Sequence, residues 1–214
     1  MFFPFKLKRL IYINFFNWDV SSDSKIGFSF IDARYVYLND GAIIKSMTVI
    51  KGLDAIILGK NSRIGTLNWL SGKSNSNVDL PGLLMLPNKY SVIEIGDESA
   101  ITNRHYIDCT SSISIGKFTT FAGVKSTMMT HSIDVYKSSQ GSSSISIGSY
   151  CFIGTDSTIL GGAYIPDYCI VGAKSLVIGM LADKYKIYGG VPARELKSLP
   201  VNLPYFKRNK GVVK

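Results

Sequence analysis

The sequence predicts a parallel β-solenoid, and three features that share one six-residue period predict it. A large aliphatic residue recurs at every sixth position from Ile147 to Val177, and again from Ile95 to Ile113. Glycine often follows this residue directly, and a small residue often stands four positions after it. A period of six matches neither the 3.6 residues of a helix turn nor the simple alternation of a sheet. A short strand and a corner every six residues instead give stacked coils of about 18 residues.

The repeated positions define the expected interior of the solenoid. Two shifts of two residues occur in the period, one after Ile56 and one after Ile113. We expect the aliphatic positions to fill the interior and the small ones to fit where the corners narrow, with glycine adopting the corner backbone angles. The aliphatic set is Ile44, Ile50, Ile56, Leu58, Ile64, Leu70, Ile95, Ile101, Ile107, Ile113, Ile115, Phe121, Ile147, Ile153, Ile159, Ile165, Val171 and Val177. The small set is Ser99, Ser111, Thr119, Cys151, Ser157, Ala163, Cys169 and Ser175.

Breaks in the period divide the chain. We expect an N-terminal segment over 1–25, the solenoid over 26–182, and a C-terminal helix with a basic tail over 183–214. Within the solenoid, a polar, turn-rich stretch predicts an excursion at about 71–90. A second break predicts a protruding loop over 132–144, directly after His131. The helix is expected over 191–197, because Pro192 suits a first helical turn.

Composition narrows the function classes. The chain has 214 residues, a formal net charge of +9 and 46% hydrophobic residues, which suits one folded domain. Part of the excess charge lies at the two ends, and no nucleic-acid-binding motif accompanies it, so we expect no nucleic-acid partner. The three cysteines, Cys109, Cys151 and Cys169, form no CxxC pair. This odd count favours a reducing compartment over a disulfide framework, and hence a cytoplasmic location.

The first residues, MFFPFKLKRLIYINFF, are aromatic and basic. The apolar run is too short for a membrane span, and no small-residue cleavage site follows it. Packing of these aromatic side chains on the domain is the simpler interpretation. The other is peripheral contact with the inner face of the membrane through Phe2, Phe3, Phe5 and Lys6.

Four features resemble the hexapeptide-repeat acyltransferases, and most of all their branch that O-acetylates sugars of bacterial surface polysaccharides. They are ITNRHYIDCTSSISIGKFTTFAGVKSTMMTHSID (101–134), ISIGSYCFIGTDSTILGGAYIPDYCIVGAKSLV (145–177), the break after His131, and YGGVPAREL (188–196). The resemblance covers roughly residues 26–200. It implies a left-handed β-helix, a homotrimer with active sites between subunits, acetyl-CoA as the co-substrate, a saccharide acceptor and no metal.

Acetyl transfer to a hydroxyl requires a general base, and histidine is the natural base near neutral pH. The chain contains two histidines. By resemblance, His131 before the protruding loop is the catalytic base. Asp134, three residues later, is the expected partner that fixes the imidazole tautomer. An exposed loop-edge histidine and a solvated aspartate are the structural alternatives.

His105 occupies a slot that a small residue normally holds, which marks it as an anomaly in the pattern. One interpretation is functional: His105 binds the acceptor sugar or completes a neighbouring subunit's site. The other is structural: His105 is a hydrogen-bonded interior residue. Asp108, in the same stretch, shares both interpretations.

The resemblance also assigns cofactor-binding positions. These are Thr155, Ala173, Lys174, Ile178, Gly179, Arg194 and Lys197. Arg194 suits a CoA phosphate because a guanidinium group forks onto phosphate oxygens. The family often has a basic residue where this chain has Gly179, so Lys174 or Lys184 is the expected substitute. Thr155 and Ala173 also fit a purely structural role at corners.

Two further functions stay open at this point, and a third does not fit the histidine count. N-acetylation of an amino sugar differs only in the acceptor, which the repeat does not specify. A non-catalytic solenoid scaffold is the candidate from outside the enzymes. A zinc enzyme of the γ-carbonic anhydrase type would need three imidazoles per metal, and the chain has two histidines.

Overall fold

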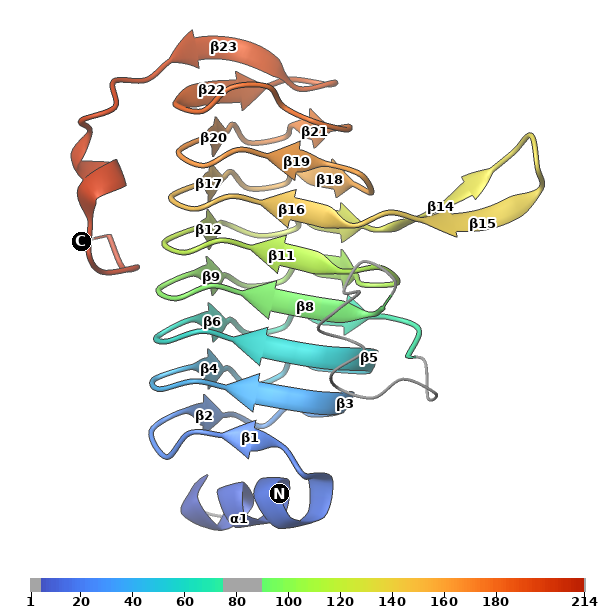
Figure 1. Ribbon diagram of the computed structural model, residues 1–214, viewed down its shortest axis with the longest axis vertical. Coiled ribbons are helices and arrows are strands. Elements are labelled where there is room, and N and C mark those ends of the chain that lie inside the picture. Colours follow the sequence, from blue (N-terminus) through green and yellow to red (C-terminus); the bar gives the residue numbers. More distant parts are fainter. Residues whose placement is uncertain (1–4, 75–89, 214) are drawn as a thin grey trace.

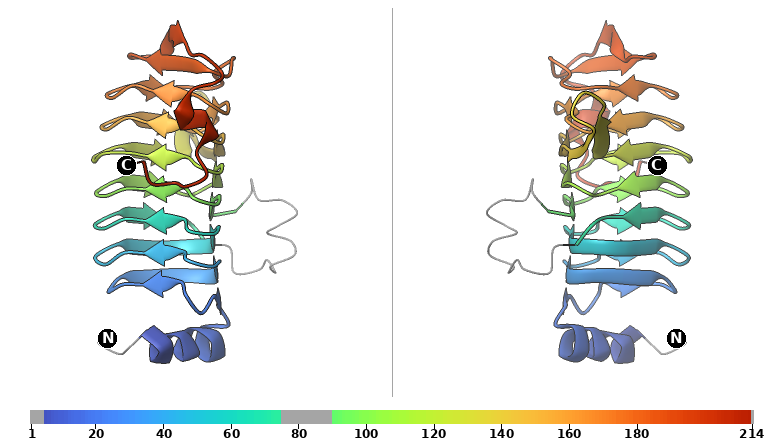
Figure 2. Two further views of the ribbon diagram at one scale, coloured as in Figure 1. Left: turned by 90° about the vertical axis from the view of Figure 1, so that its left-hand side faces the viewer. Right: turned by 90° about the vertical axis from the view of Figure 1, so that its right-hand side faces the viewer.

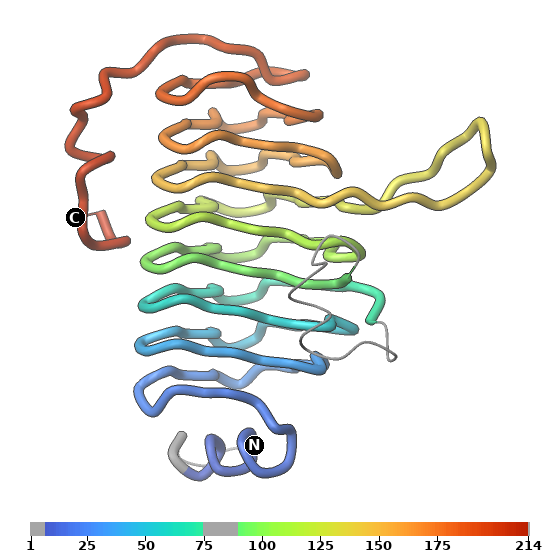
Figure 3. Tube along the Cα trace, in the orientation of Figure 1, coloured from blue at the N-terminus to red at the C-terminus, as the bar shows by residue number. Residues whose placement is uncertain are grey.

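The computed structural model describes residues 5–74 and 90–213. Their strands stack into a left-handed parallel β-helix with three faces (Figures 1 and 3). The first face contains β1 (Asp19–Val20), the C-terminal parts of β3 (Phe30–Leu38) and β5 (Val49–Leu58), β8 (Val92–Ile95), β11 (Ile113–Ile115), β16 (Ile145–Ile147) and β19 (Tyr164–Ile165). The second contains β2 (Lys25–Ile26), β4 (Ile43–Ile44), β6 (Arg63–Ile64), β9 (Ala100–Ile101), β12 (Thr120–Phe121), β17 (Phe152–Ile153), β20 (Ile170–Val171) and β22 (Lys186–Gly189). The third contains the N-terminal parts of β3 and β5, β7 (Trp69–Ser71), β10 (Tyr106–Asp108), β13 (Thr127–Met129), β18 (Thr158–Leu160) and β21 (Leu176–Val177).

Three columns of corners connect the faces. The first corner leads from the first face to the second, the second corner from the second face to the third, and the third corner back to the first face. The helix α1 (Phe5–Phe16) lies across the N-terminal end of the stack (Figures 1 and 2).

The interior confirms the six-residue pattern. All eighteen predicted aliphatic or aromatic positions are buried, and so are the eight predicted small positions. The shifts of two residues have a physical cause on the first face. Strands there turn two residues inward, as in β11, where Ile113 and Ile115 are buried and Ser114 between them is exposed. A strand that supplies two interior residues delays the next corner by two positions.

Glycine has a different role at the corners from the one the sequence predicts. A Cβ on Gly116 would lie 2.6 Å from a backbone carbon of Gly148, and one on Gly148 would lie 2.5 Å from the backbone nitrogen of Asp167. Close stacking of successive coils therefore requires glycine there. These glycines, which directly follow the aliphatic positions, do not have positive φ angles; at the first corner such angles fall on bulkier residues such as Phe118, Tyr150 and Tyr168.

The break after His131 forms a β-hairpin. Strands β14 (His131–Asp134) and β15 (Ser139–Ser142) pair antiparallel and project from the third corner (Figure 1). His131 pairs with Ser142 at the base of the hairpin. Part of the predicted excursion at 71–90, residues 75–89, lies outside the described residues.

The predicted helix over 191–197 is wrong. Residues Arg194–Ser198 form the strand β23, which pairs antiparallel with β22. The reason is the open edge at the C-terminal end of the second face. Because backbone groups at an edge need partners, pairing with β22 satisfies the segment better than a short helix would.

The basic tail is ordered and runs back along the first corner (Figure 2). It includes a short 3-10 helix, η2 (Pro204–Lys207), whose Phe206 is buried. Phe206 meets the rings of Tyr168 and Tyr185 edge-on, at centroid distances of 5.4 and 5.5 Å. These two rings belong to a stack with Phe118 and Tyr150. Arg208 donates hydrogen bonds to the carbonyls of Tyr205 and Phe118. The protein thus covers its own first corner.

Candidate functional site

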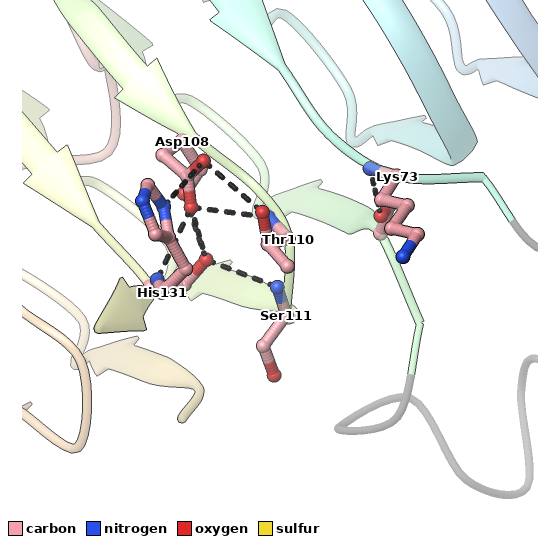
Figure 4. Close-up of polar contacts among 7 residues, drawn as sticks. Lys73, Asp108, Thr110, Ser111 and His131 are labelled. Carbon is pink, nitrogen blue, oxygen red and sulfur yellow. Dashed lines mark hydrogen bonds and ion pairs between the residues drawn. The ribbon is translucent and has the colours of Figure 1, made fainter. Parts of the chain in front are cut away.

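The candidate site lies at the third corner, where the hairpin begins. His131 is the first residue of β14, and Asp108 ends β10 in the preceding coil. The Nδ1 atom of His131 lies 3.0 Å from Oδ2 of Asp108 (Figure 4). The side chain of Asp108 is 9% exposed, whereas that of His131 is 42% exposed. The pair therefore joins a buried carboxylate to an imidazole that a substrate can reach.

Several donors hold the Asp108 carboxylate in place (Figure 4). Its Oδ1 accepts hydrogen bonds from the Thr130 hydroxyl at 2.7 Å and from the His131 backbone N–H at 3.2 Å. The backbone N–H and hydroxyl of Thr110 donate to Oδ1 and Oδ2, at 3.2 and 3.1 Å. Burial by itself would raise the pKa of Asp108, but the bonds from Thr130 and Thr110 and the nearby His131 outweigh it and lower that pKa. Asp108 is therefore a carboxylate at neutral pH.

This geometry assigns the tautomer of His131. A carboxylate only accepts hydrogen bonds, so Nδ1 carries the proton that points at Asp108. The neutral imidazole then has its lone pair on Nε2. An imidazole with Nε2 available and Nδ1 oriented by a carboxylate is the arrangement of a general base.

The structure corrects the expected partner of His131. Asp134 lies on the same strand of the hairpin, and its Oδ1 accepts the backbone N–H groups of Tyr136 and Lys137 at 3.0 and 3.2 Å. Its Oδ2 lies 3.7 Å from Nζ of Lys137. Asp134 thus stabilises the hairpin turn, and Asp108 takes the orienting position. The expected acceptor-binding role of Asp108 is corrected accordingly, because its oxygens are occupied by these donors.

His105 is an interior residue, so the acceptor-binding interpretation is also corrected. It is 2% exposed and lies in the second corner, with its ring 4.8 Å from that of Phe121. The imidazole replaces a small residue in a ladder of hydrogen bonds between coils. The backbone N–H of His105 donates to Oδ1 of Asn68, and the backbone N–H of Ser126 donates to Nδ1 of the His105 ring. The same pattern links Ser126 to Ser157 and Ser157 to Ser175.

The ladder fixes the protonation state of His105. Because Nδ1 accepts from Ser126, the ring proton is on Nε2, 2.9 Å from the Thr102 hydroxyl oxygen. The Thr102 hydroxyl donates in turn to the carbonyl of Gly123 at 2.8 Å. Burial lowers the pKa of His105 from 6.5 to about 4. His105 is thus neutral and fully hydrogen bonded near pH 7.

Five of the seven predicted cofactor residues are divided between two corners. Thr155, Ala173 and Lys174 lie at the second corner. The Thr155 hydroxyl accepts the N–H of Val124 at 3.0 Å and donates to the Val124 carbonyl at 2.8 Å, as its structural interpretation requires. Ala173 is exposed, and Nζ of Lys174 lies 3.2 Å from Oδ2 of Asp156 on the surface.

Ile178 and Gly179 lie at the third corner, the corner of His131. Between them and the hairpin stands Gly161-Gly162, where a Cβ on Gly161 would lie 2.8 Å from the carbonyl oxygen of Thr130. Gly179 has a φ of 70°, and a Cβ added to it would meet no described residue beyond its chain neighbours within 4 Å. The third corner therefore has tightly stacked glycine next to the hairpin and open space beside Gly179.

Arg194 and Lys197 both lie on β23 and are exposed. The guanidinium of Arg194 donates to the carbonyl of Ala193 at 3.2 Å. Lys184, the expected alternative to Lys174, is paired with Asp167 at 2.8 Å at the first corner. Since that corner lies away from His131, Lys184 is not brought into the site.

Sequence reasoning missed Thr110 and Thr130, which hold the orienting carboxylate. The register of the coils could have identified them, because Asp108 pairs with Met129 and so stands beside Thr130 and His131. The signal that could have identified the pair is the register of Asp108, which lies one coil before His131 at the same corner.

Metal-binding clusters and exposed cysteine thiols are absent from the described part of the chain. No cluster of three or more His, Cys, Asp or Glu side chains there is arranged to hold a metal ion. All three cysteines are buried, and burial raises the pKa of Cys151 to about 12. No described helix is long and apolar enough to cross a membrane.

Comparison with solved structures shows the same fold in hexapeptide-repeat acyltransferases. The polysialic acid O-acetyltransferase OatWY is 16% identical, with a TM-score of 0.63 over 85% of this chain and 84% of that one. A variant of the N-acyltransferase AntD from Bacillus cereus, solved with dTDP-4-amino-4,6-dideoxyglucose and coenzyme A, is 20% identical, with a TM-score of 0.62 over 91% and 88%.

A hexapeptide-repeat acetyltransferase from Vibrio cholerae, solved with acetyl-CoA, is 22% identical, with a TM-score of 0.53 over 66% of this chain and 70% of that one. No protein-family model matches the sequence, and no curated protein matches it. The chain therefore has the left-handed β-helix fold that these hexapeptide-repeat acyltransferases share.

Proposed function

We propose that the protein is an acetyl-CoA-dependent O-acetyltransferase that acts on a saccharide hydroxyl, with His131 as the general base. The observation that carries this proposal is the pair of His131 and Asp108 at the base of the hairpin. A buried carboxylate orients a reachable imidazole, and the two lie 3.0 Å apart. The shared fold with acyltransferases, including a saccharide O-acetyltransferase, supports the same reaction class.

In the proposed reaction, Nε2 of His131 removes the proton from the acceptor hydroxyl as its oxygen attacks the thioester carbonyl. Asp108 stabilises the imidazolium that forms, because its carboxylate faces Nδ1. Collapse of the tetrahedral intermediate breaks the carbon–sulfur bond, and the imidazolium returns its proton to the departing CoA thiolate. The products are the acetyl ester and CoA, and His131 is neutral again.

The residues fit acetyl-CoA in two respects. Open space beside Gly179 at the third corner would take a slender chain, next to the exposed apolar side chains of Ile178 and Met180. Arg194 and Lys197 supply exposed cationic groups at the same end of the β-helix for phosphate oxygens. Acetyl-CoA would supply the activated acetyl group, and the remaining chemistry belongs to His131 and Asp108.

We also propose a homotrimer with its sites between subunits. Five of the seven predicted cofactor residues lie at the second and third corners, so these five can meet only if the second corner of one subunit faces the third corner of the next. Such a head-to-tail contact closes into a ring. A strip of exposed apolar side chains at the second corner and on the third face supports this contact: Phe28, Phe30, Met47, Leu67, Trp69 and Tyr106. The first corner is covered by the chain's own C-terminal segment.

Acylation of an amino sugar is the second candidate function. The similarity to AntD, which was solved with a nucleotide-linked amino sugar, favours it over the non-catalytic scaffold. A neutral amine needs less help from a base before it attacks, so this reaction would depend less on His131 than O-acetylation does.

We assign the enzyme to surface-polysaccharide synthesis in the cytoplasm, where acetyl-CoA is available.

The test is acetyl transfer from radiolabelled acetyl-CoA to a panel of saccharides, with CoA release followed by a thiol reagent. The panel pairs each neutral sugar with its amino sugar, free and nucleotide-linked. The proposal expects CoA release with an acceptor and an alkali-labile ester product. An alkali-stable amide product would favour the second candidate. No transfer to any acceptor by a protein that binds CoA would leave the non-catalytic scaffold.

A further inference from the structure

We propose that α1 is a docking surface for an anionic lipid bilayer. The helix carries the sequence FKLKRLIYINFF, with three basic residues and no acidic residue among its twelve. It lies across the N-terminal end of the β-helix, so one of its sides faces the coils and the other faces away (Figures 1 and 2).

The side of α1 that faces the coils holds the helix in place. Nε of Arg9 donates to the carbonyl of Val20 in β1 at 2.7 Å. Tyr12 packs against the core and stacks on Trp18, with ring centroids 5.2 Å apart. The backbone N–H of Trp18 also donates to the backbone carbonyl of Tyr12 at 3.0 Å. These contacts fix the rotation of the helix about its own axis.

The opposite side of α1 is exposed and mostly apolar. Leu7, Leu10 and Phe15 are 43%, 53% and 87% exposed. At 100° per residue these three positions fall on one half of the helix, with the half-buried Ile11 and the exposed Asn14 between them. Arg9, Tyr12 and Phe16 fall on the other half, where the Phe16 ring lies 5.1 Å from that of Trp18. This is the reverse of an ordinary packed helix, which turns its apolar side toward the core. The inward side of α1 contacts β1 and Trp18, so only the outward side is free to bind a partner.

The chemistry of α1 selects a bilayer as that partner. A helix that lies in a membrane interface inserts leucine and phenylalanine among the acyl chains, while lysine and arginine attract anionic headgroups. Lys8 stands at the border between the two sides of α1 and is placed to make such a contact. The side chains of Phe2, Phe3, Phe5 and Lys6 lie outside the described part of the chain, and the proposal does not use them.

The position of α1 would orient the whole molecule. Because the helix lies across the end of the stack, docking would stand the β-helix upright on the membrane. In a trimer with parallel subunits, three copies of α1 would share one plane and bind with greater avidity. This increase depends on the proposed trimer, whereas docking of a single helix does not depend on the proposed function.

The experiment is co-sedimentation of the full chain with vesicles of phosphatidylcholine, with or without about one third phosphatidylglycerol. We expect the wild type to bind the anionic vesicles and to be released in part by salt. The double variant Leu10→Ser/Phe15→Ser should bind at least about tenfold more weakly. Lys8→Glu should weaken binding to the vesicles that contain phosphatidylglycerol and should not change binding to the vesicles of phosphatidylcholine only.

The matched control is Val201→Ser/Val213→Ser, which removes two exposed apolar side chains from the C-terminal segment and should bind like the wild type. His131→Ala should also bind like the wild type, so a failure of the proposed catalysis would not affect this result. The proposal is overturned if the wild type stays in the supernatant, or if Leu10→Ser/Phe15→Ser binds unchanged. It is also overturned if α1 instead joins two particles end to end, which light scattering would detect as a doubled mass that the double variant loses.

Discussion

The two histidines of the chain lie at neighbouring corners of the β-helix and have opposite surroundings. His105 is enclosed at the second corner, where Asn68, Ser126 and Thr102 occupy its hydrogen-bonding groups. His131 stands at the third corner with one nitrogen on Asp108 and a side chain that is open to solvent. Enclosure keeps the first imidazole neutral and inert. The second combines access with orientation, and these two properties together define a candidate base.

The difference arises from what each corner does with the chain. At the second corner the ladder passes one hydrogen bond from each coil to the next, so any polar side chain in that slot is used internally. At the third corner the chain leaves the stack after Thr130 and forms the hairpin of β14 and β15. This departure leaves His131 at the base of the hairpin, outside the stacked coils. Variants at the two corners should therefore separate the structural residue from the functional one.

The largest expected effect is on stability at the second corner. His105→Ala leaves a cavity beside Phe121 and removes the acceptor for the Ser126 N–H, so the free energy of unfolding should fall by about 3–5 kcal/mol. Chemical denaturation measures this loss. His105→Asn is the matched control, because Asn68 shows that an asparagine can continue the ladder, and it should cost less. Equal losses in the two variants would contradict the role of the ladder.

The pH dependence of stability tests the same residue. The pKa of His105 is about 4 in the folded protein and about 6.5 in the unfolded chain, so between these values the unfolded state binds more protons. Stability therefore rises with pH through this window, and the contribution is complete above pH 6.5. On acidification to pH 4 the wild type should lose about 3 kcal/mol from this group. His105→Asn should lack this component, whereas His131→Ala should retain it.

Asp108→Asn tests the orienting carboxylate. An amide at this position no longer stabilises the imidazolium, so kcat should fall by about 10–100-fold, measured below the melting temperature of the variant. That melting temperature should itself fall, because the amide NH2 group cannot accept the bonds that the carboxylate accepts. Asp134→Asn provides the matched control at the aspartate near His131 in sequence, and its kcat should stay within about twofold. A larger loss for Asp134→Asn than for Asp108→Asn would restore the assignment expected from sequence.

Arg194→Ala is expected to have the smallest effect. The exposed guanidinium would contact a CoA phosphate, so CoA should bind about 3–10-fold more weakly, and the difference should shrink as salt is added. Calorimetry at low and high salt measures both. Lys184→Ala should leave the affinity unchanged, since Lys184 is paired with Asp167 away from the site. Unaltered binding by Arg194→Ala would direct attention to Lys174.

The fold could be predicted because each repeated position has one physical role. Ile153 and Val171 occupy equivalent buried positions in successive coils, and so do Cys151 and Cys169, so the period alone identifies them. A protruding loop after His131 could also be predicted, as a break in that period, although its antiparallel pairing could not. The C-terminal strand β23 could not, because its pairing with β22 depends on an edge that the sequence of 191–197 does not reveal.

The site could be predicted only in part, for a related reason. His131 stands out as one of two histidines beside a break, but its partner lies one coil earlier in the chain. Asp134 was the nearer aspartate in sequence, while Asp108 is the nearer one in space. The two-residue shifts on the first face obscured this register. His105 looked unusual in the pattern, although hydrogen bonding inside the corner explains it.

The most direct test of the account compares kcat for acetyl transfer in wild type, His131→Ala and His105→Asn, each shown to be folded and to bind CoA. If His131 is the base, its removal should lower kcat by about 10²–10⁴-fold. His105→Asn should keep kcat near that of the wild type. Near-normal turnover by His131→Ala, together with loss of turnover in a folded His105→Asn protein, would contradict the account and exchange the roles of the two histidines.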